Sequence, residues 1–140
     1  MKQVRTATAP AIAPILVIED EASVAAFLRS ALERRGYSVV PSPSACEGLQ
    51  LLETGDYCGV ISDVRTPGGV SGADVHAWIL SHRPELISRV IFITGDIASR
   101  ETAALLKHSG APFVEKPFRV AELLSMVKRT IGDPRENHER

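Results

Sequence analysis

The chain has 140 residues, which suffices for one domain with a single core and is too short for two ordinary domains. Apolar residues make up 44% and charged residues 24% of the sequence, which is typical of a globular protein and excludes a disordered or fibrous one. The net charge of −1, without a dense stripe of Lys and Arg, provides no field that would attract DNA, so we expect no direct binding of nucleic acid.

The ends of the chain show no targeting or membrane-spanning pattern. No apolar run approaches the roughly 18 residues that a membrane span needs. Residues 1–13 carry a little positive charge but lack the apolar segment of a signal peptide, and 133–140 are polar. We therefore expect a cytoplasmic protein with one domain over 14–132, a flexible N-terminal lead over 1–13 and a flexible tail over 133–140.

The first predicted strand is the continuous apolar run 15–18, which has the pattern of a strand covered on both faces. It ends in the acids 19–21, of which Glu21 fits a helix N-terminal acid favoured by the helix dipole. Apolar residues between 24 and 32 then recur at helical spacing, and Gly36 marks the end of that helix.

Residues 37–40 predict a second strand, which we place at the margin of the sheet because Pro41, Ser42 and Pro43 directly follow it. Ser42 is the expected N-cap and Pro43 the first-turn proline of a helix that ends at Gly55. The later elements are a strand over 58–62, a helix over 73–82, a strand over 90–93, a helix over 99–109, a strand over 113–115 and a helix over 120–131.

Alternation of five strands with five helices predicts the fold class. Right-handed βαβ crossovers produce a parallel sheet with helices on both faces, a doubly wound (βα)5 sandwich of the α/β class. In such sheets the ligand site lies at the carboxyl ends of the strands. That edge is therefore where we expect the functional residues.

Polar side chains follow four of the five predicted strands. Glu19 and Asp20 follow the first strand, Asp63 the third, Thr94 the fourth and Lys116 the fifth. Three neighbouring carboxylates repel one another unless a cation lies between them, and a hard divalent cation with oxygen ligands, Mg²⁺ (or Mn²⁺), would remove the repulsion. With that cation and the Lys116 ammonium, the site is electrically neutral.

An aspartate beside such a cation can attack a phosphoryl group, and Asp63 is the best placed candidate. Thr94 can donate a hydrogen bond to one phosphoryl oxygen, and Lys116 can neutralise another. The chemistry that these residues indicate is formation of an aspartyl phosphate.

Cysteine and histidine residues do not have metal-binding spacing. Cys46 and Cys58 form no CxxC pair, and we expect both to be small buried apolar residues. The four histidines have no zinc-site spacing, and we expect them at the surface: His76, His82, His108 and His138.

Four motifs, VIEDE, ISDVRTP, FITGD and VEKPF, each follow or overlap the end of a predicted strand. In this order they resemble the receiver domain of bacterial response regulators, from about residue 15 to residue 131. The resemblance implies a flavodoxin-like fold with a five-stranded parallel sheet. It also implies a role in two-component signalling, with a phosphoryl group accepted from a histidine kinase or a histidine phosphotransfer protein.

Matched position by position, the resemblance assigns a role to each site residue. Asp63 corresponds to the phosphoacceptor, Asp20 to a direct Mg²⁺ ligand, and Glu19 to the acid that binds the metal through water. Arg65 corresponds to the residue whose backbone carbonyl binds the metal. The matches for the remaining positions are Thr94 and Phe113 as the switch pair, Lys116 as the family lysine, and Lys116–Pro117 as a cis peptide bond. Phe113 also fits a plain core residue.

Two positions depart from the commonest form of the family. Glu19 stands where an aspartate is usual, which leaves direct and water-mediated ligation both open. Gly72 falls nine residues after Asp63 instead of eight, and the segment 67–69 resembles receivers attached to hybrid histidine kinases. Arg65 and Asp96 occupy positions that flank the path of the attacking water in this family, and we hypothesise that they pair and slow hydrolysis.

The leading function is therefore a receiver that catalyses only its own phosphorylation and slow dephosphorylation. No output domain follows residue 131, so we expect it to signal by binding a downstream protein through the last two helices, or to act as a relay or phosphate sink; an excised receiver of a hybrid kinase would look the same. One alternative is a receiver-like interaction module that works without phosphorylation. Another is a haloacid dehalogenase-type phosphatase, which is disfavoured because it needs an acid where Arg65 stands.

Overall fold

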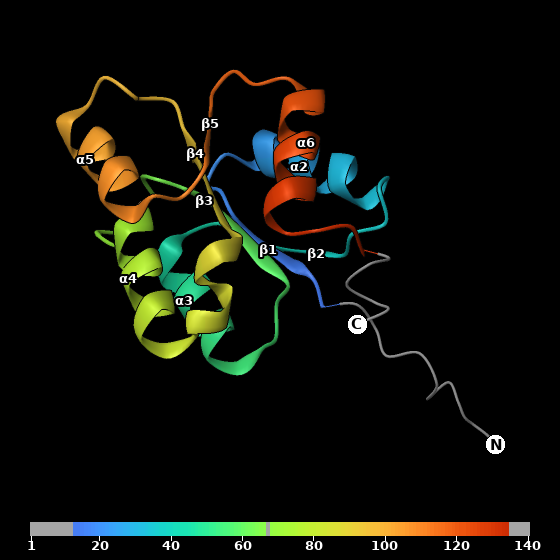
Figure 1. Cartoon of the computed structure of the whole chain (residues 1–140), viewed down its shortest axis with the longest axis horizontal. Coiled ribbons are helices and arrows are strands. Elements are labelled where there is room, and N and C mark those ends of the chain that lie inside the picture. Colours follow the sequence, from blue (N-terminus) through green and yellow to red (C-terminus); the bar gives the residue numbers. More distant parts are fainter. Residues whose placement is uncertain (1–12, 67, 135–140) are drawn as a thin grey trace.

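Five short strands form one parallel sheet in the order β2-β1-β3-β4-β5 (Figure 1). The computed structural model describes residues 13–66 and 68–134, so most of the predicted flexible segments 1–13 and 133–140 lies outside the described residues. The strands are β1 (Ile15–Ile18), β2 (Val39–Ser42), β3 (Gly59–Asp63), β4 (Val90–Thr94) and β5 (Phe113–Glu115). The predicted fold class is confirmed, and β2 lies at the sheet margin as expected.

Helices cover both faces of the sheet (Figure 1). They are α2 (Ala22–Glu33), α3 (Ala45–Thr54), α4 (Gly72–His82), α5 (Arg100–Ser109) and α6 (Val120–Thr130), with a short 3₁₀ helix, η1 (Pro84–Arg89). Helices α2 and α6 contribute to the core on one face, and α3, α4 and α5 contribute to the core on the other. The flavodoxin-like sandwich therefore has its sheet in the middle layer.

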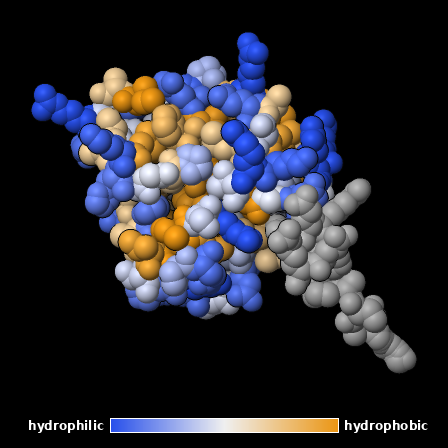
Figure 2. All heavy atoms as spheres, in the orientation of Figure 1, coloured by the Kyte–Doolittle hydropathy of each residue, from blue (hydrophilic) through white to orange (hydrophobic). Residues whose placement is uncertain are grey.

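The strands alternate their side chains between the two cores. Ile15 and Val17 of β1 pack with α2 and α6, whereas Leu16 and Ile18 pack with the opposite layer. This alternation follows from the twofold period of a strand, and it explains why β1 is apolar at every position. Figure 2 shows hydrophilic side chains over most of the outer surface, with apolar side chains along the middle of the face in view.

The start of α3 differs from the prediction. Ser42 is the last residue of β2, pairing with Ile18, and Ser44 is the N-cap whose side chain accepts a hydrogen bond from the Glu47 amide at 3.2 Å. The prediction was wrong because β2 continues through Pro41, which a marginal strand tolerates since it needs no donor on its open side.

The prediction for Cys46 was also wrong, because this residue is exposed while Cys58 is buried. The buried positions of α3 are Ala45, Gly48 and Leu52, which lie three and four residues apart on one face. Cys46 lies on the opposite side of the helix, where the apolar period no longer holds.

Among residues 13–66 and 68–134, no helix has the length and apolar character required to cross a bilayer.

Candidate functional site

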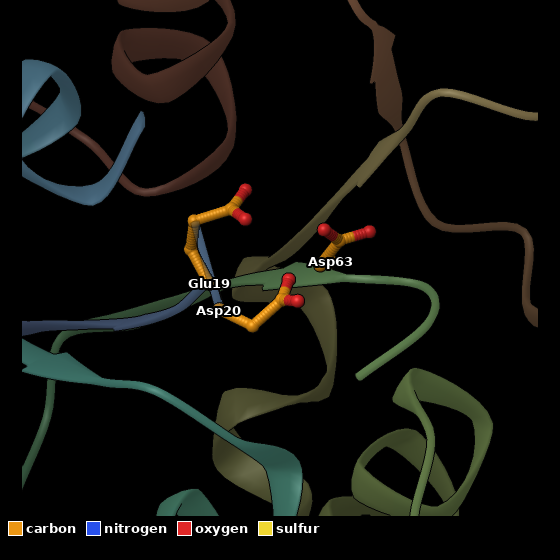
Figure 3. Close-up of side chains that lie close together, drawn as sticks. All are labelled: Glu19, Asp20 and Asp63. Carbon is orange, nitrogen blue, oxygen red and sulfur yellow. The ribbon is translucent and has the colours of Figure 1, made fainter. Parts of the chain in front are cut away.

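Three carboxylates meet at the carboxyl edge of the sheet (Figure 3). Glu19 and Asp20 directly follow β1, Asp63 is the last residue of neighbouring β3, and each offers an oxygen within 4.8 Å of the others. Glu19 and Asp63 are buried, whereas Asp20 is exposed. β1 and β3 are parallel neighbours, and their last paired residues are Ile18 and Ser62. The residues that directly follow the two strands therefore lie side by side at the same edge of the sheet, as predicted.

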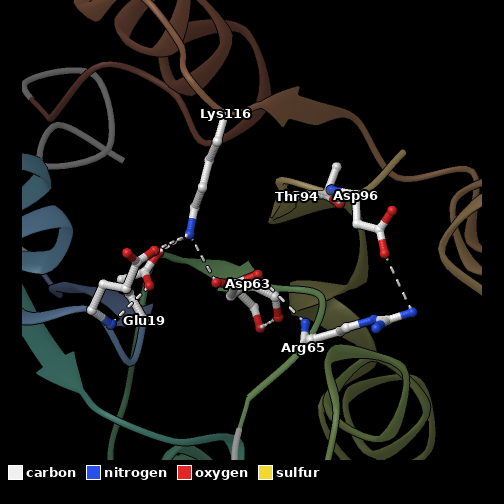
Figure 4. A network of polar contacts seen from close by, with 8 residues as sticks. Glu19, Asp63, Arg65, Thr94, Asp96 and Lys116 are labelled. Carbon is white, nitrogen blue, oxygen red and sulfur yellow. Dashed lines mark hydrogen bonds and ion pairs between the residues drawn. The ribbon is translucent and has the colours of Figure 1, made fainter. Parts of the chain in front are cut away.

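Lys116 joins this cluster from the connection after β5 (Figure 4). Its Nζ atom lies 2.9 Å from Glu19 Oε1, 3.0 Å from Asp63 Oδ2 and 3.1 Å from Glu21 Oε1. The Lys116 amide donates to the Thr94 carbonyl at 2.8 Å, which extends the pairing of β5 with β4 to the lysine. The Lys116–Pro117 peptide bond is cis. The lysine thus reaches Asp63 from two strands away and the acids after β1 from three strands away.

The contact of Glu21 with Lys116 is a feature that the sequence analysis missed. Glu21 is the N-cap residue of α2, but its side chain makes no capping hydrogen bond and turns to Lys116 instead. Its amide donates to Glu19 Oε2 at 3.0 Å. The signal available in the sequence was its place in the same acidic run directly after β1.

The environment of Glu19 suits a hard cation. Burial raises the pKa of Glu19, and the Glu21 amide and the Lys116 ammonium offset this only in part. Oxygen Oε1 is fully buried and has no hydrogen bond, because Lys116 Nζ approaches it at ion-pair distance without hydrogen-bond geometry. A buried carboxylate oxygen that accepts no hydrogen bond, and that lies beside two further carboxylates, fits as a ligand of a divalent ion such as Mg²⁺.

Lys116 is held in its charged form by the same groups. Burial opposes its charge, but the contacts of the ammonium with the carboxylates of Glu19, Asp63 and Glu21 outweigh burial and raise the pKa of Lys116 above its ordinary value. At neutral pH the ammonium therefore carries a full charge 3.0 Å from Asp63.

Thr94 ends β4, next to β3, and is buried. Its Oγ1 accepts a hydrogen bond from the Asp96 amide at 3.1 Å. Phe113 begins β5 and pairs with Phe92 in the sheet, yet 36% of its surface is exposed. The alternative that Phe113 is a plain core residue is therefore wrong.

Arg65 and Asp96 form an ion pair between two connections that leave the sheet at this edge (Figure 4). Arg65 Nη2 lies 3.6 Å from Asp96 Oδ2, and both side chains are exposed. The same Nη2 donates to Ser99 Oγ at 2.8 Å. The Arg65 amide points back to Asp63 Oδ1 at 3.4 Å, so the backbone of Arg65 lies beside the carboxylate cluster.

The connection after Asp63 is attached at both ends. Thr66 Oγ1 donates to the Val70 carbonyl at 2.7 Å and accepts from the Ala45 amide at 3.1 Å, which joins the loop to the start of α3. At the far end, a Cβ added to Gly72 would lie 2.8 Å from the Asp63 carbonyl oxygen. Glycine is therefore required at this position because the start of α4 approaches the backbone of Asp63 closely.

This fold and edge cluster define an α/β protein with a candidate cation site beside a buried aspartate and a charged lysine. A sequence profile described as "response regulator receiver domain" matches residues 15–128, and the chain belongs to this family. Receiver domains accept a phosphoryl group in two-component signalling, interact with histidine kinases or phosphotransfer proteins, and bind Mg²⁺ at an acidic pocket.

Similar proteins include the uncharacterized transcriptional regulatory protein YkoG of Bacillus subtilis, which is 32% identical over 117 residues; the match covers 84% of this chain and 50% of that protein. The chain thus spans half the length of this curated relative. Among solved structures, a receiver domain from Clostridium thermocellum has a TM-score of 0.72 at 29% identity and covers 89% of this chain and 98% of that one. The receiver domain of a histidine kinase from Syntrophus aciditrophicus has a TM-score of 0.75 at 28% identity, with coverages of 85% and 89%.

Proposed function

We propose that Asp63 accepts a phosphoryl group from the phosphohistidine of a kinase or phosphotransfer protein, and that this modification switches the binding of a downstream protein. The observation that carries the proposal is the buried Asp63 carboxylate, held 3.0 Å from a charged lysine and beside two further acids. An oxygen of Asp63 bonds to phosphorus, the bond from phosphorus to the donor's ring nitrogen breaks, and the imidazole leaves with its electron pair.

The neighbouring residues support this transfer. Glu19, Asp20, Asp63 and the Arg65 carbonyl would hold Mg²⁺, which when bound would neutralise charge on the transferred group. Lys116 would bind one phosphoryl oxygen, since its ammonium lies 3.0 Å from the carboxylate of Asp63, the proposed acceptor. The buried Thr94 hydroxyl would bind another.

We further propose that Thr94 and Phe113 report the phosphorylation. When Thr94 Oγ1 turns to the phosphoryl group it releases the Asp96 amide that it now accepts from. The half-exposed Phe113 ring on the neighbouring strand then has room to turn inward. The partner surface would be that of α5 and α6, where four basic residues are exposed: Lys107, Arg119, Lys128 and Arg129.

Arg65 and Asp96 would set the lifetime of the phosphoryl group. Their ion pair joins the two connections that flank the acceptor, where it hinders the approach of water. Arg65→Ala and Asp96→Ala should each hydrolyse the aspartyl phosphate faster than the wild type. Unchanged rates in both variants would contradict this role.

Incubation with acetyl phosphate and Mg²⁺, followed by intact-mass measurement, tests the proposed function. We expect one phosphoryl adduct on the wild type, none on Asp63→Asn, and none after chelation of Mg²⁺. Asp56→Asn is the matched control, because this aspartate is 94% exposed and pairs with Arg83 away from the site. A phosphorylated phosphotransfer protein serves as a second donor. Absence of the adduct with both donors would favour a phosphorylation-independent interaction module.

Turnover of small phosphate esters separates the receiver from a phosphatase. We expect no turnover that depends on Asp63, because Arg65 occupies the position where an aspartyl-nucleophile phosphatase carries its second acid. Turnover by the wild type that is lost in Asp63→Asn would contradict the proposal.

A further inference from the structure

The Arg65 guanidinium has a second anchor besides Asp96. Nη2 donates to Ser99 Oγ at 2.8 Å, which is shorter than its 3.6 Å distance to Asp96 Oδ2. Ser99 lies at the end of the connection from β4 and is the N-cap residue of α5. The Ser99 amide donates to the Asp96 carbonyl at 3.2 Å, so the two anchors belong to one turn.

The hydroxyl of Ser99 serves two donors at once. It accepts from the Thr102 amide at 3.4 Å as a helix cap, and from Arg65 at the shorter distance. A hydroxyl oxygen has two lone pairs, so both bonds can form together. The shorter of the two bonds is the one to Arg65. Capping of α5 therefore does not by itself explain the position of the Ser99 hydroxyl.

The two anchors differ in what they can do for Arg65. An exposed ion pair such as Arg65 with Asp96 contributes little and leaves long side chains free to move. A hydrogen bond of 2.8 Å is directional and specifies where the guanidinium lies. With Asp96 alone, Arg65 would be attracted to the far connection without being fixed there.

We propose that Ser99 is a positioning residue that holds Arg65 across the mouth of the acceptor site and thereby lengthens the life of the aspartyl phosphate. This inference rests on the proposed function of Asp63. In hydrolysis a water oxygen attacks phosphorus, the bond between phosphorus and the Asp63 oxygen breaks, and Asp63 leaves as a carboxylate. The products are Asp63 and inorganic phosphate, with the water's proton released to solvent or phosphate.

The test compares hydrolysis rates after acetyl phosphate is removed, in the presence of Mg²⁺, by intact mass over time. Ser99→Gly removes the acceptor for Arg65 but places at the N-cap a residue that this position tolerates well, so the helix is little affected. We expect hydrolysis about two- to fivefold faster, the factor that loss of a contact worth about 0.5–1 kcal/mol produces. Ser99→Thr keeps the hydroxyl and should restore the wild-type rate.

Two further variants separate positioning from helix capping. Ser44→Gly removes the N-cap serine of α3, which accepts from the Glu47 amide, and it should leave the hydrolysis rate unchanged. In an Arg65→Ala background, Ser99→Gly should have no further effect, because Ser99 acts through Arg65. Helix content is followed by circular dichroism in every variant.

The outcomes distinguish this inference from the function on which it rests. If the wild type forms an adduct but Ser99→Gly loses it at the wild-type rate, the positioning role is overturned and the acceptor role stands. If Ser99→Gly accelerates hydrolysis equally with and without Arg65, Ser99 acts by another route and the inference is again overturned. If no adduct forms with either donor, both proposals fail.

Discussion

Replacing Lys116 with methionine should destabilise the fold, because its ammonium contacts three carboxylates at 2.9–3.1 Å. Removal of one partner from a buried ion pair typically costs about 3–5 kcal/mol. Here the loss is smaller, since the Lys116 side chain is 20% exposed and Glu21, at 60%, stays solvated without it. We expect a loss of about 2–4 kcal/mol, which corresponds to a fall in Tm of roughly 6–12 °C for a chain of this size.

Urea unfolding at neutral pH, with and without Mg²⁺, measures this loss. Mg²⁺ should stabilise Lys116→Met more than the wild type, because the metal replaces a positive charge that the variant lacks. The loss should also shrink as the pH falls from neutral, because Lys116 lowers the pKa of Glu19, and without the lysine this carboxylate takes up a proton more readily and then needs no cationic partner. Burial raises the pKa of Glu19, so the protonated acid favours the folded state, and its stabilising contribution is present at low pH and lost as the pH rises through that pKa.

Lys107→Met is the matched control, since Lys107 is an exposed lysine on α5. The reasoning is refuted if Lys116→Met is no less stable than this control at neutral pH. It is equally refuted if the difference between them grows on acidification.

Three further predictions concern other parts of the molecule. Gly72→Ala should lower the free energy of unfolding by about 1–3 kcal/mol and slow phosphorylation by acetyl phosphate, because the new Cβ would lie 2.8 Å from the Asp63 carbonyl oxygen; an unchanged urea midpoint would contradict this. Cys46 should react with a maleimide in the folded protein, and Cys58 only after unfolding, because Cys58 is buried and burial raises the pKa of its thiol; equal labelling in the native state would be the contrary result. Burial lowers the pKa of His76 from its ordinary 6.5, so the neutral ring favours the fold and stability should fall as the pH drops below about 6.5; urea titrations should show a smaller fall in His76→Gln, and an equal fall would refute this.

Much of the site was predictable from the order of apolar runs and the residues that end them. Glu19, Asp20 and Asp63 follow apolar runs whose pattern predicts buried strands, and Lys116 follows the short strand predicted over 113–115. Once alternation with helices indicates a parallel sheet, the ends of the strands must lie at one edge, so residues far apart in the chain are brought together.

Other features depend on which direction each side chain takes and on where each strand stops. Ser44 caps α3 because β2 extends to Ser42, and the length of β2 is set by its pairing with β1. Cys46 is exposed because it lies on the outer side of α3. A preference for a residue type, such as the burial of cysteine, is overruled by the face on which the residue falls.

The sequence by itself determined the order of the elements, the parallel sheet and the acidic edge with its lysine, because these follow from the period of apolar residues along the chain. Only the tertiary structure decided that Glu21 turns to Lys116 and that Ser99 binds Arg65. The physical reason is that these contacts are made by single polar side chains between separate connections. Their distances and angles are set by the packing of the whole fold, and the position of a residue along the sequence does not specify which partner its side chain contacts.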